Sequence, residues 1–316
     1  MKPAVRKRRA PRHQGWALGI DVGATNVRAG LVHVSSGSIR CSHATPTEAA
    51  GGKRHSLARL ALVAGQTVAA GKARGVAATL VGIGIPELVG NTGQIDSQCS
   101  LKWRAKDVHN LLQRYGAVTI ASDVRAAALA EARLGAGTGA AAFLYVSVGT
   151  GISSTLVIDG EPFTGAHGHA ISFASGPTFV SSDSAGHTTY AALESRAAGP
   201  GLLSRAQALG AMEEDAMAVC RKARQSAGLH RDIVDAAATE LAIHVAVVAN
   251  ALDPTLIVMG GGLGSSSGRY WTTFRAAVHR HLWGPNSRRL PIRHAALGPR
   301  AGLIGAALAA VEARHS

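Results

Sequence analysis

Two apolar strands joined by an acidic, glycine-bearing turn occupy residues 17–32, which read ALGIDVGATNVRAGLV. Asp21 ends the first strand, where a carboxylate can hold magnesium (Mg²⁺) directly or through water. Gly23 has no side chain and lets backbone amides approach a polyphosphate closely, while Thr25 and Asn26 add short side-chain donors. The segment therefore predicts a phosphate-binding hairpin, with a purely structural hairpin as the alternative.

Two more glycine turns follow apolar strands later in the chain. Residues 143–158, FLYVSVGTGISSTLVI, repeat the layout of strand, turn and strand. Residues 255–266, TLIVMGGGLGSS, follow a buried strand and precede a helix-like segment, where backbone amides can pack against a nucleotide. Three such turns favour a nucleotide site over unrelated hairpins. The residues assigned to the two later turns are Gly149, Thr150, Gly151, Gly260, Gly261 and Gly262.

Strand patterns alternate with helical patterns, such as the apolar spacing of Leu241, Val245, Val248 and Leu252, and this alternation predicts an α/β fold. With 316 residues, 47% of them hydrophobic, the chain can bury a large core and suggests two lobes. It has no uninterrupted apolar run that could span a bilayer and no apolar signal core, so we expect a cytoplasmic protein with no membrane partner. Its three isolated cysteines argue against a disulfide framework.

The net charge of +14 raises the question of nucleic-acid binding, because basic patches bind phosphate backbones. Six of the positive charges and no acid lie in residues 1–15. This composition predicts a basic disordered tail that is solvated, and makes a nucleic-acid-binding arm the less favoured interpretation.

Asp123 is the candidate group for proton transfer. Phosphoryl transfer requires positioning, charge neutralisation and a group that accepts the proton of the attacking hydroxyl, and a carboxylate can accept it. Asp123 lies directly after the apolar stretch VTIA and before an alanine-rich helical segment. The same position suits a helix N-cap, which is the structural alternative.

Taken together, these motifs resemble the ROK (repressor, open reading frame, kinase) family of sugar kinases, within the actin, Hsp70 and hexokinase superfamily. The resemblance spans nearly the whole chain. Besides the three turns, it rests on GIGIPELVGNTGQI, SDVRAAALAEARLGAG, GAHGHA, DPTLIVMGGGL and AGLIGAALA, which follow the family's order and spacing.

The resemblance implies two actin-like (ribonuclease H-like) lobes around a nucleotide cleft, with residues 16–122 plus 301–316 in the small lobe and 123–300 in the large lobe. It implies ATP and Mg²⁺ as cofactors, Asp123 as the catalytic base, and Asp21 with magnesium organising the phosphates. The turns at Gly23 and Gly149 would bracket ATP. A homodimer is also implied.

Departures from the family pattern fall on the acceptor site. Ser100 and Ser122 stand where the family has asparagines, and Ser172 stands where it has a glutamate that binds sugar. Glu194 remains and can accept hydrogen bonds from a polyol. Two histidines lie beside the pocket loop and could face an anionic group or only solvent; they are His167 and His169.

The family's zinc motif is also changed. Its ligand positions fall on Ser175, Ala185, His187 and Ala192, which leave at most one nitrogen ligand. Because a structural zinc site needs four ligands, we expect no bound zinc.

The sequence therefore predicts an ATP-dependent kinase acting on a cyclitol, a modified sugar, or a sugar or cyclitol phosphate of secondary metabolism, such as antibiotic biosynthesis. Cationic partners for an acceptor phosphate would come from Lys102, Arg104, His167 and His169. The alternatives are an ordinary glucokinase and a non-catalytic, ligand-sensing ROK relative. The repressor interpretation is weak, because about fifteen residues before Trp16 are too few for a helix-turn-helix domain.

Overall fold

The computed structural model describes residues 15–225 and 227–314. The predicted basic tail at residues 1–15 lies outside this part of the chain, apart from its last residue. Within the described residues, 15–141, 157–171 and 299–314 form one compact unit, and 142–156 and 172–298 form a second. No helix of the described residues is long and apolar enough to cross a membrane.

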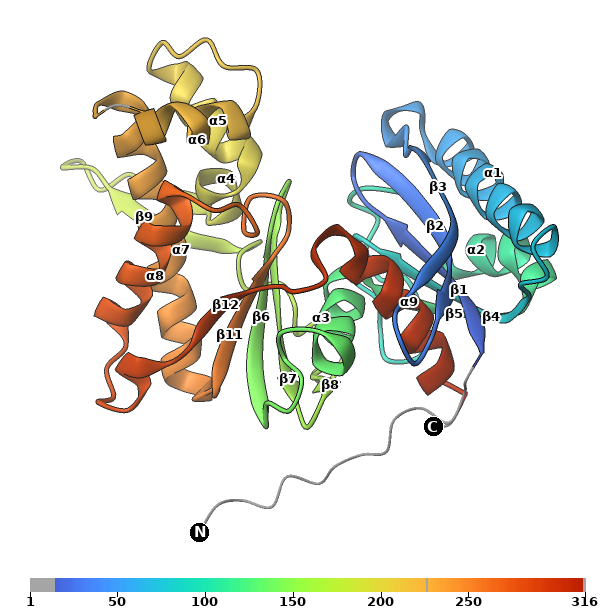
Figure 1. Ribbon diagram of the computed structural model, residues 1–316. Coiled ribbons are helices and arrows are strands. Elements are labelled where there is room, and N and C mark those ends of the chain that lie inside the picture. The colour runs from blue at the N-terminus through green and yellow to red at the C-terminus, as the bar shows by residue number, and fades with distance from the viewer. Residues whose placement is uncertain (1–14, 226, 315–316) are drawn as a thin grey trace. The chain divides into compact units, whose positions relative to one another are not determined.

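The first unit is built on a five-stranded sheet of order β3-β2-β1-β4-β5 (Figure 1). Strands β1 and β2 pair antiparallel, as do β2 and β3, whereas β4 is parallel to both β1 and β5. The strands are β1 (Trp16–Val22), β2 (Asn26–His33), β3 (Ile39–Pro46), β4 (Ala78–Ile85) and β5 (Ala117–Ser122).

Helices cover both faces of this sheet (Figure 1). On one face α1 packs on β2 and β3 and is joined by α2, while α9 packs on β1, β4 and β5 on the other face and is backed by α3. The helices are α1 (Lys53–Lys72), α2 (Ala105–Leu112), α3 (Asp123–Leu134) and α9 (Ala301–Glu312), and the 3₁₀ turns are η1 (Ala49–Gly51), η2 (Gln113–Tyr115) and η4 (Gly298–Arg300).

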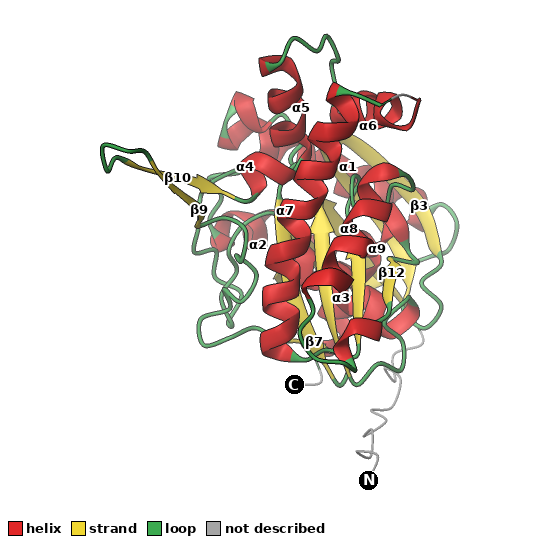
Figure 2. Ribbon diagram, turned by 90° about the vertical axis from the view of Figure 1, so that its left-hand side faces the viewer, coloured by secondary structure: helices red, strands yellow, loops and turns green. Residues whose placement is uncertain are grey.

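The second sheet has the order β12-β11-β6-β7-β8, with β11 parallel to both β6 and β12. Long helices lie along it, and the two-stranded ribbon β9–β10 projects to one side (Figure 2). The strands are β6 (Ala142–Val148), β7 (Ile152–Ile158), β8 (Glu161–Pro162), β9 (Pro177–Ser182), β10 (Thr188–Ala192), β11 (Leu256–Gly260) and β12 (Ile292–His294). The helices are α4 (Glu194–Ala197), α5 (Gly199–Ala208), α6 (Ala216–Gln225), α7 (Leu229–Leu252), α8 (Arg269–His281) and the 3₁₀ turn η3 (Ser287–Arg289). Two five-stranded sheets with covering helices confirm the predicted α/β class.

Glycines let α9 sit unusually close to its neighbours. A Cβ added at Gly82 on β4 would lie 1.7 Å from the backbone oxygen of Ala306, and one added at Gly305 would lie 1.7 Å from that of Ala126 on α3. Any larger residue at either position would force backbone movement. Because α9 is wedged between the sheet and α3 in this way, α3 belongs to the first unit. The sequence-based lobe boundary placed residues 123–300, and so α3, in the large lobe, and those lobe limits stay a prediction.

Candidate active site

Asp21 lies at the end of β1, with β2 on one side and β4 on the other. Its β-sheet neighbours are Arg28 on β2 and Gly84 on β4. The carboxylate rests against Gly302 at the start of α9, since a Cβ there would be 2.6 Å from Asp21 Oδ1. Burial raises the pKa of Asp21 to about 6, and the positive charge of Arg28 partly opposes the shift. A carboxylate oxygen at this position suits a hard divalent cation such as Mg²⁺, whose charge would offset the cost of burying the ionised group.

Asp123 is the first residue of α3, directly after β5. Its Oδ1 accepts a hydrogen bond from the amide of Val124 at 2.7 Å and a long one from the hydroxyl of Ser122 at 3.5 Å. Burial and then the negative charge of Asp21 raise the pKa of Asp123 to about 7, against the lowering effect of those two donors. A carboxylate with a pKa near neutrality can take up a proton under physiological conditions, as a general base must.

Ser122 is the N-cap residue of α3 and is fully buried. Its hydroxyl lies against the Asp123 carboxylate, so the structure places it beside the candidate base. The N-cap interpretation of Asp123 is therefore wrong by one residue: Asp123 is the first residue of the helix, and its Oδ1 accepts a hydrogen bond from the amide of the next residue, Val124. Contact of Ser122 with an acceptor stays a prediction.

The hairpin turn after Asp21 is held in shape by the chain that follows β3. The amide of Gly23 donates to the Asn26 oxygen at 2.9 Å, and the Thr47 hydroxyl donates to the Gly23 oxygen at 2.7 Å. The amide of Thr47 also donates to the Thr25 oxygen at 2.9 Å. A Cβ at Gly23 would meet nothing closer than 3.4 Å, so packing within the protein does not require glycine there. Close approach of a phosphate to the backbone at Gly23 stays a prediction.

The other two glycine turns lie in contact with each other in the second unit. The amides of Leu263 and Gly264, directly after the 260–262 turn, both donate to the Val148 oxygen at 3.0 Å. A Cβ at Gly149 would lie 3.7 Å from the Gly262 nitrogen. The start of α5 joins them, because the amide of Gly199 donates to the Gly149 oxygen at 2.8 Å. Both turns were predicted from the sequence, whereas the contact of Gly199 with them was not.

Glu194, the first residue of α4, lies beside the Gly151 end of this cluster. Its Oε2 accepts a long hydrogen bond from the Ile152 amide at 3.4 Å, and its own amide donates to the Ala174 oxygen at 3.3 Å. That second bond ties Glu194 to the segment that contains Ser172, whose side chain is exposed. The structure thus brings these two candidate acceptor residues into neighbouring segments of one unit.

A buried carboxylate that the sequence analysis missed organises the loop of Ser100. Glu87, only 4% exposed, follows β4 and accepts four hydrogen bonds, one of them from the Ser97 hydroxyl. The amides of Cys99, Ser100 and Leu101 supply the others at 3.0, 2.7 and 2.8 Å. Its position directly after the apolar run GIGIP was the available sequence signal. Ser100 itself is exposed, so Glu87 sets its backbone while leaving its hydroxyl accessible.

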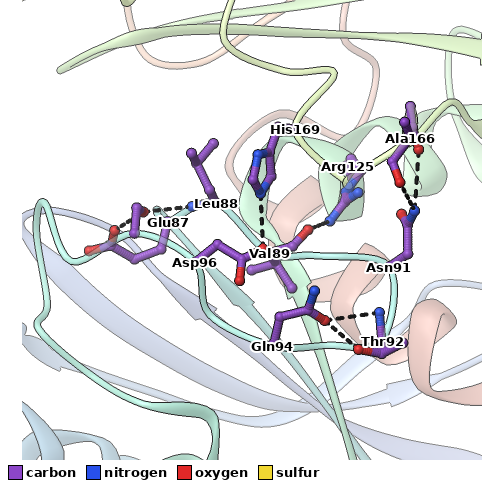
Figure 3. Close-up of polar contacts among 12 residues, drawn as sticks. Glu87, Leu88, Val89, Asn91, Thr92, Gln94, Asp96, Arg125, Ala166 and His169 are labelled. Carbon is purple, nitrogen blue, oxygen red and sulfur yellow. Dashed lines mark hydrogen bonds and ion pairs between the residues drawn. The ribbon is translucent and has the colours of Figure 1, made fainter.

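The loop that follows Glu87 is bonded to the segment of the two candidate histidines (Figure 3). Asn91 Nδ2 donates to the oxygens of Gly165 and Ala166 at 3.2 and 3.1 Å. His169 Nε2 lies 2.9 Å from Asp96 Oδ2. His167 is exposed.

Two of the four cationic candidates for an acceptor phosphate are therefore paired with carboxylates of this chain. His169 pairs with Asp96, and Arg104 Nε lies 3.3 Å from Asp107 Oδ2. Of the changed zinc-motif positions, Ala185 and His187 lie in the turn before β10 and Ala192 ends β10, whereas Ser175 lies before β9. His187 Nδ1 lies 3.1 Å from Asp183 Oδ2. The absence of zinc stays a prediction.

Comparison with known proteins bears on this arrangement. The chain is 30% identical over 305 residues to the kanosamine kinase of Amycolatopsis mediterranei, and the aligned region covers 92% of this chain and 94% of that protein. It is 26% identical over 320 residues to the glucokinase of Streptomyces coelicolor, and this match covers 93% of this chain and 96% of that protein. Among solved structures, the ROK hexokinase from Thermus thermophilus has a TM-score of 0.75 at 27% identity, covering 95% of this chain and 100% of that one.

A further solved structure supports the fold alone. The ROK family glucokinase from Streptomyces griseus, in complex with glucose and AMPPNP, has a TM-score of 0.80 at 24% identity, covering 94% of this chain and all of that one. The model of the ROK family matches residues 17–313. This chain therefore belongs to the ROK family.

Proposed function

We propose that this protein is an ATP-dependent kinase that phosphorylates a hydroxyl group of a sugar-like polyol. The observation that carries the proposal is the placement of Asp123 at the start of α3, with its pKa raised to about 7 by burial and by the charge of Asp21. A sensor that only binds its ligand needs no such base. The relatives named as sugar kinases support the same class of reaction.

In this proposal the glycine turns bind the nucleotide. The Gly149 and Gly260 turns of the second unit offer backbone amides, as does the Gly23 turn of the first unit. Asp21 would hold Mg²⁺ directly or through water, and the bound ion would neutralise charge on the phosphates. Thr25 and Asn26 add hydrogen-bond donors beside the same turn.

Asp123 carries out the proton transfer. As the acceptor oxygen forms its bond to the γ-phosphorus, the bond from that phosphorus to the β,γ-bridging oxygen breaks and ADP leaves. The hydroxyl proton passes to an Asp123 carboxylate oxygen, which must be ionised beforehand. The raised pKa strengthens that oxygen as a proton acceptor.

For the acceptor, we propose a cyclitol, a modified sugar, or a phosphate of either, rather than plain glucose. Three serines, Ser100, Ser122 and Ser172, shorten the side chains where the family binds hexose, and Glu194 keeps one carboxylate for polyol hydroxyls. Similarity to a kanosamine kinase supports a modified sugar and a role in antibiotic biosynthesis. Similarity to glucokinases favours the second candidate, an ordinary glucokinase.

An acceptor survey tests the proposal. ADP release would be followed with hexoses, amino sugars, cyclitols and their monophosphates, each at several concentrations with MgATP. We expect at least one modified sugar, cyclitol or monophosphate to exceed glucose in kcat/KM. If glucose has a higher kcat/KM than every other acceptor, the protein is an ordinary glucokinase. If no acceptor stimulates ADP release, the non-catalytic sensor is favoured.

A further inference from the structure

Arg125 is a buried cation on α3, two residues after Asp123. The residue is 8% exposed. Its Nη2 donates to the backbone oxygen of Val89, and its Nη1 is buried without a hydrogen-bond partner among the described residues. Burial lowers the pKa of the guanidinium, which nevertheless stays charged because arginine starts so high. A neutral carbonyl does not balance this charge.

A second arginine on the same helix provides the contrast. Arg133 has a side chain that is 19% exposed, and it is paired with Glu312 at 2.8 Å and with Glu161. Buried charges in proteins are generally paired in this way, because an unpaired buried charge destabilises the folded state. Among the described residues, no carboxylate forms an ion pair with Arg125 as Glu312 and Glu161 do with Arg133.

Arg125 lies among segments that contain candidate acceptor residues, namely the loop after Glu87, with Ser100, and the segment of His167 and His169. Figure 3 shows its guanidinium pointing to Val89, between His169 and Asn91. The neighbouring carboxylate of Asp96 is bonded to His169. Arg125 therefore lies where the loop after Glu87 meets the 165–169 segment, two residues along the helix from the proposed base.

We propose that Arg125 binds an anionic group of the acceptor molecule, a phosphate or carboxylate carried in addition to the hydroxyl that is phosphorylated. This inference rests on the proposed kinase function and narrows its acceptor to an anionic one. Arg125 takes the place of Arg104 and His169 as a cation expected to face that group, because Arg104 is already paired with Asp107 and His169 with Asp96. Arginine suits the role, since its planar donors match the oxygens of carboxylates and phosphates.

The test measures binding of small anions to protein saturated with AMPPNP and Mg²⁺, so that the nucleotide's own phosphate positions are filled. Inorganic phosphate and acetate would be titrated by calorimetry into the wild-type protein and into Arg125→Met, Arg125→Gln and Lys106→Met. Lys106 is the matched control, because it is an exposed cation on α2 to which no role at the acceptor is assigned. Comparing the affinities for phosphate and acetate shows whether the site prefers a phosphate or a carboxylate group.

We expect the wild-type protein to bind one of the two anions, and both Arg125 variants to bind it about tenfold or more weakly, as for loss of a charge-assisted bond. Lys106→Met should change the affinity by about twofold or less, as for an exposed charge. Thermal unfolding adds a second readout: without anion, Arg125→Met should be at least as stable as wild type, because an unpaired buried charge has been replaced by an apolar side chain.

The proposal is overturned if the wild-type protein binds neither anion, or if the Arg125 variants bind as well as wild type. It is also overturned if Arg125→Met unfolds or melts well below wild type, because Arg125 would then serve the fold. A failure of the kinase proposal would give a different result: the protein would bind an anion in a way that depends on Arg125, but no acceptor would stimulate ADP release.

Discussion

The negative charge of Asp21 acts on Asp123, and together with burial it raises the pKa of the Asp123 carboxyl to about 7. Asp21 ends β1 and Asp123 begins α3, and Gly84 on β4 lies beside both of them. A Cβ at Gly84 would be 3.4 Å from the Asp123 Cα. Close packing of α9 against β4 and α3 fixes this arrangement, so the fold itself makes Asp123 a stronger proton acceptor than an exposed aspartate.

The first prediction concerns the titration of this pair. In ligand-free protein, carboxyl ¹³C NMR should show Asp123 titrating near pH 7 and Asp21 near pH 6, as coupled groups. Because the base must be ionised, activity should rise as pH increases through the Asp123 midpoint. Asp21→Asn removes a negative charge and should move the Asp123 midpoint to lower pH. A wild-type Asp123 that titrates like an exposed aspartate, near pH 4, would contradict this prediction.

The second prediction assigns Asp21 to the magnesium-bound phosphates. Asp21→Asn should weaken binding of Mg-AMPPNP by about tenfold or more, because a ligand to the cation loses its charge. Calorimetry with and without Mg²⁺ measures the effect. Asp159→Asn is the matched control, since Asp159 is exposed and its positive φ of 50° is readily adopted by asparagine. Equal nucleotide affinity in Asp21→Asn and the control would remove Asp21 from the phosphate site.

The third prediction concerns Glu87 and the acceptor loop. Glu87→Gln keeps the shape of the side chain but brings an NH₂ group against amides that need an acceptor. We expect KM for the acceptor to rise about tenfold, on the scale of charge-assisted hydrogen bonds, with KM for ATP nearly unchanged. Steady-state kinetics in both substrates give the comparison, and Glu214→Gln serves as an exposed control. Equal increases in both KM values would indicate a general loss of structure.

The fourth prediction is that purified protein contains no stoichiometric zinc. Ser175, Ala185 and Ala192 stand at ligand positions of the family motif and supply no thiolate or imidazole. Elemental analysis after purification without added metal should therefore find far less than one zinc per chain, and a chelator should leave the melting temperature unchanged. One zinc per chain, or unfolding by the chelator, would show a site that the family motif does not describe.

Local patterns in the sequence were sufficient to predict some of the turns and helix starts. An apolar strand followed by a glycine turn is a local signal, and the structure places the Gly149 and Gly260 turns in contact. That these turns bind a nucleotide stays a prediction. Asp123 was likewise recognisable from the strand before it and the helix after it. These assignments depend on residues adjacent in the chain.

The parts that were missed depend on residues distant in the chain. Glu87 matters because its carboxylate meets amides at residues 99–101, and Thr47 because its hydroxyl reaches Gly23. Arg125 looks like any charged residue of a helix until its burial and its contact with Val89 are known. The packing of α3 with the first sheet is also a contact between distant segments, because it is made through α9 near the end of the chain, and the predicted lobe limits stay a prediction.

Turnover by Asp123→Asn, measured as ADP release with the best acceptor found, tests the central proposal most directly. The substitution keeps the size of the side chain and an oxygen for the Val124 amide, while removing the ability to accept the hydroxyl proton. Asp159→Asn is again the control for loss of a carboxylate. We expect kcat to fall about 10²-fold or more while the affinity for Mg-AMPPNP is retained. A variant that keeps nearly the wild-type kcat would contradict the assignment of Asp123 as the base and, with it, the proposed mechanism.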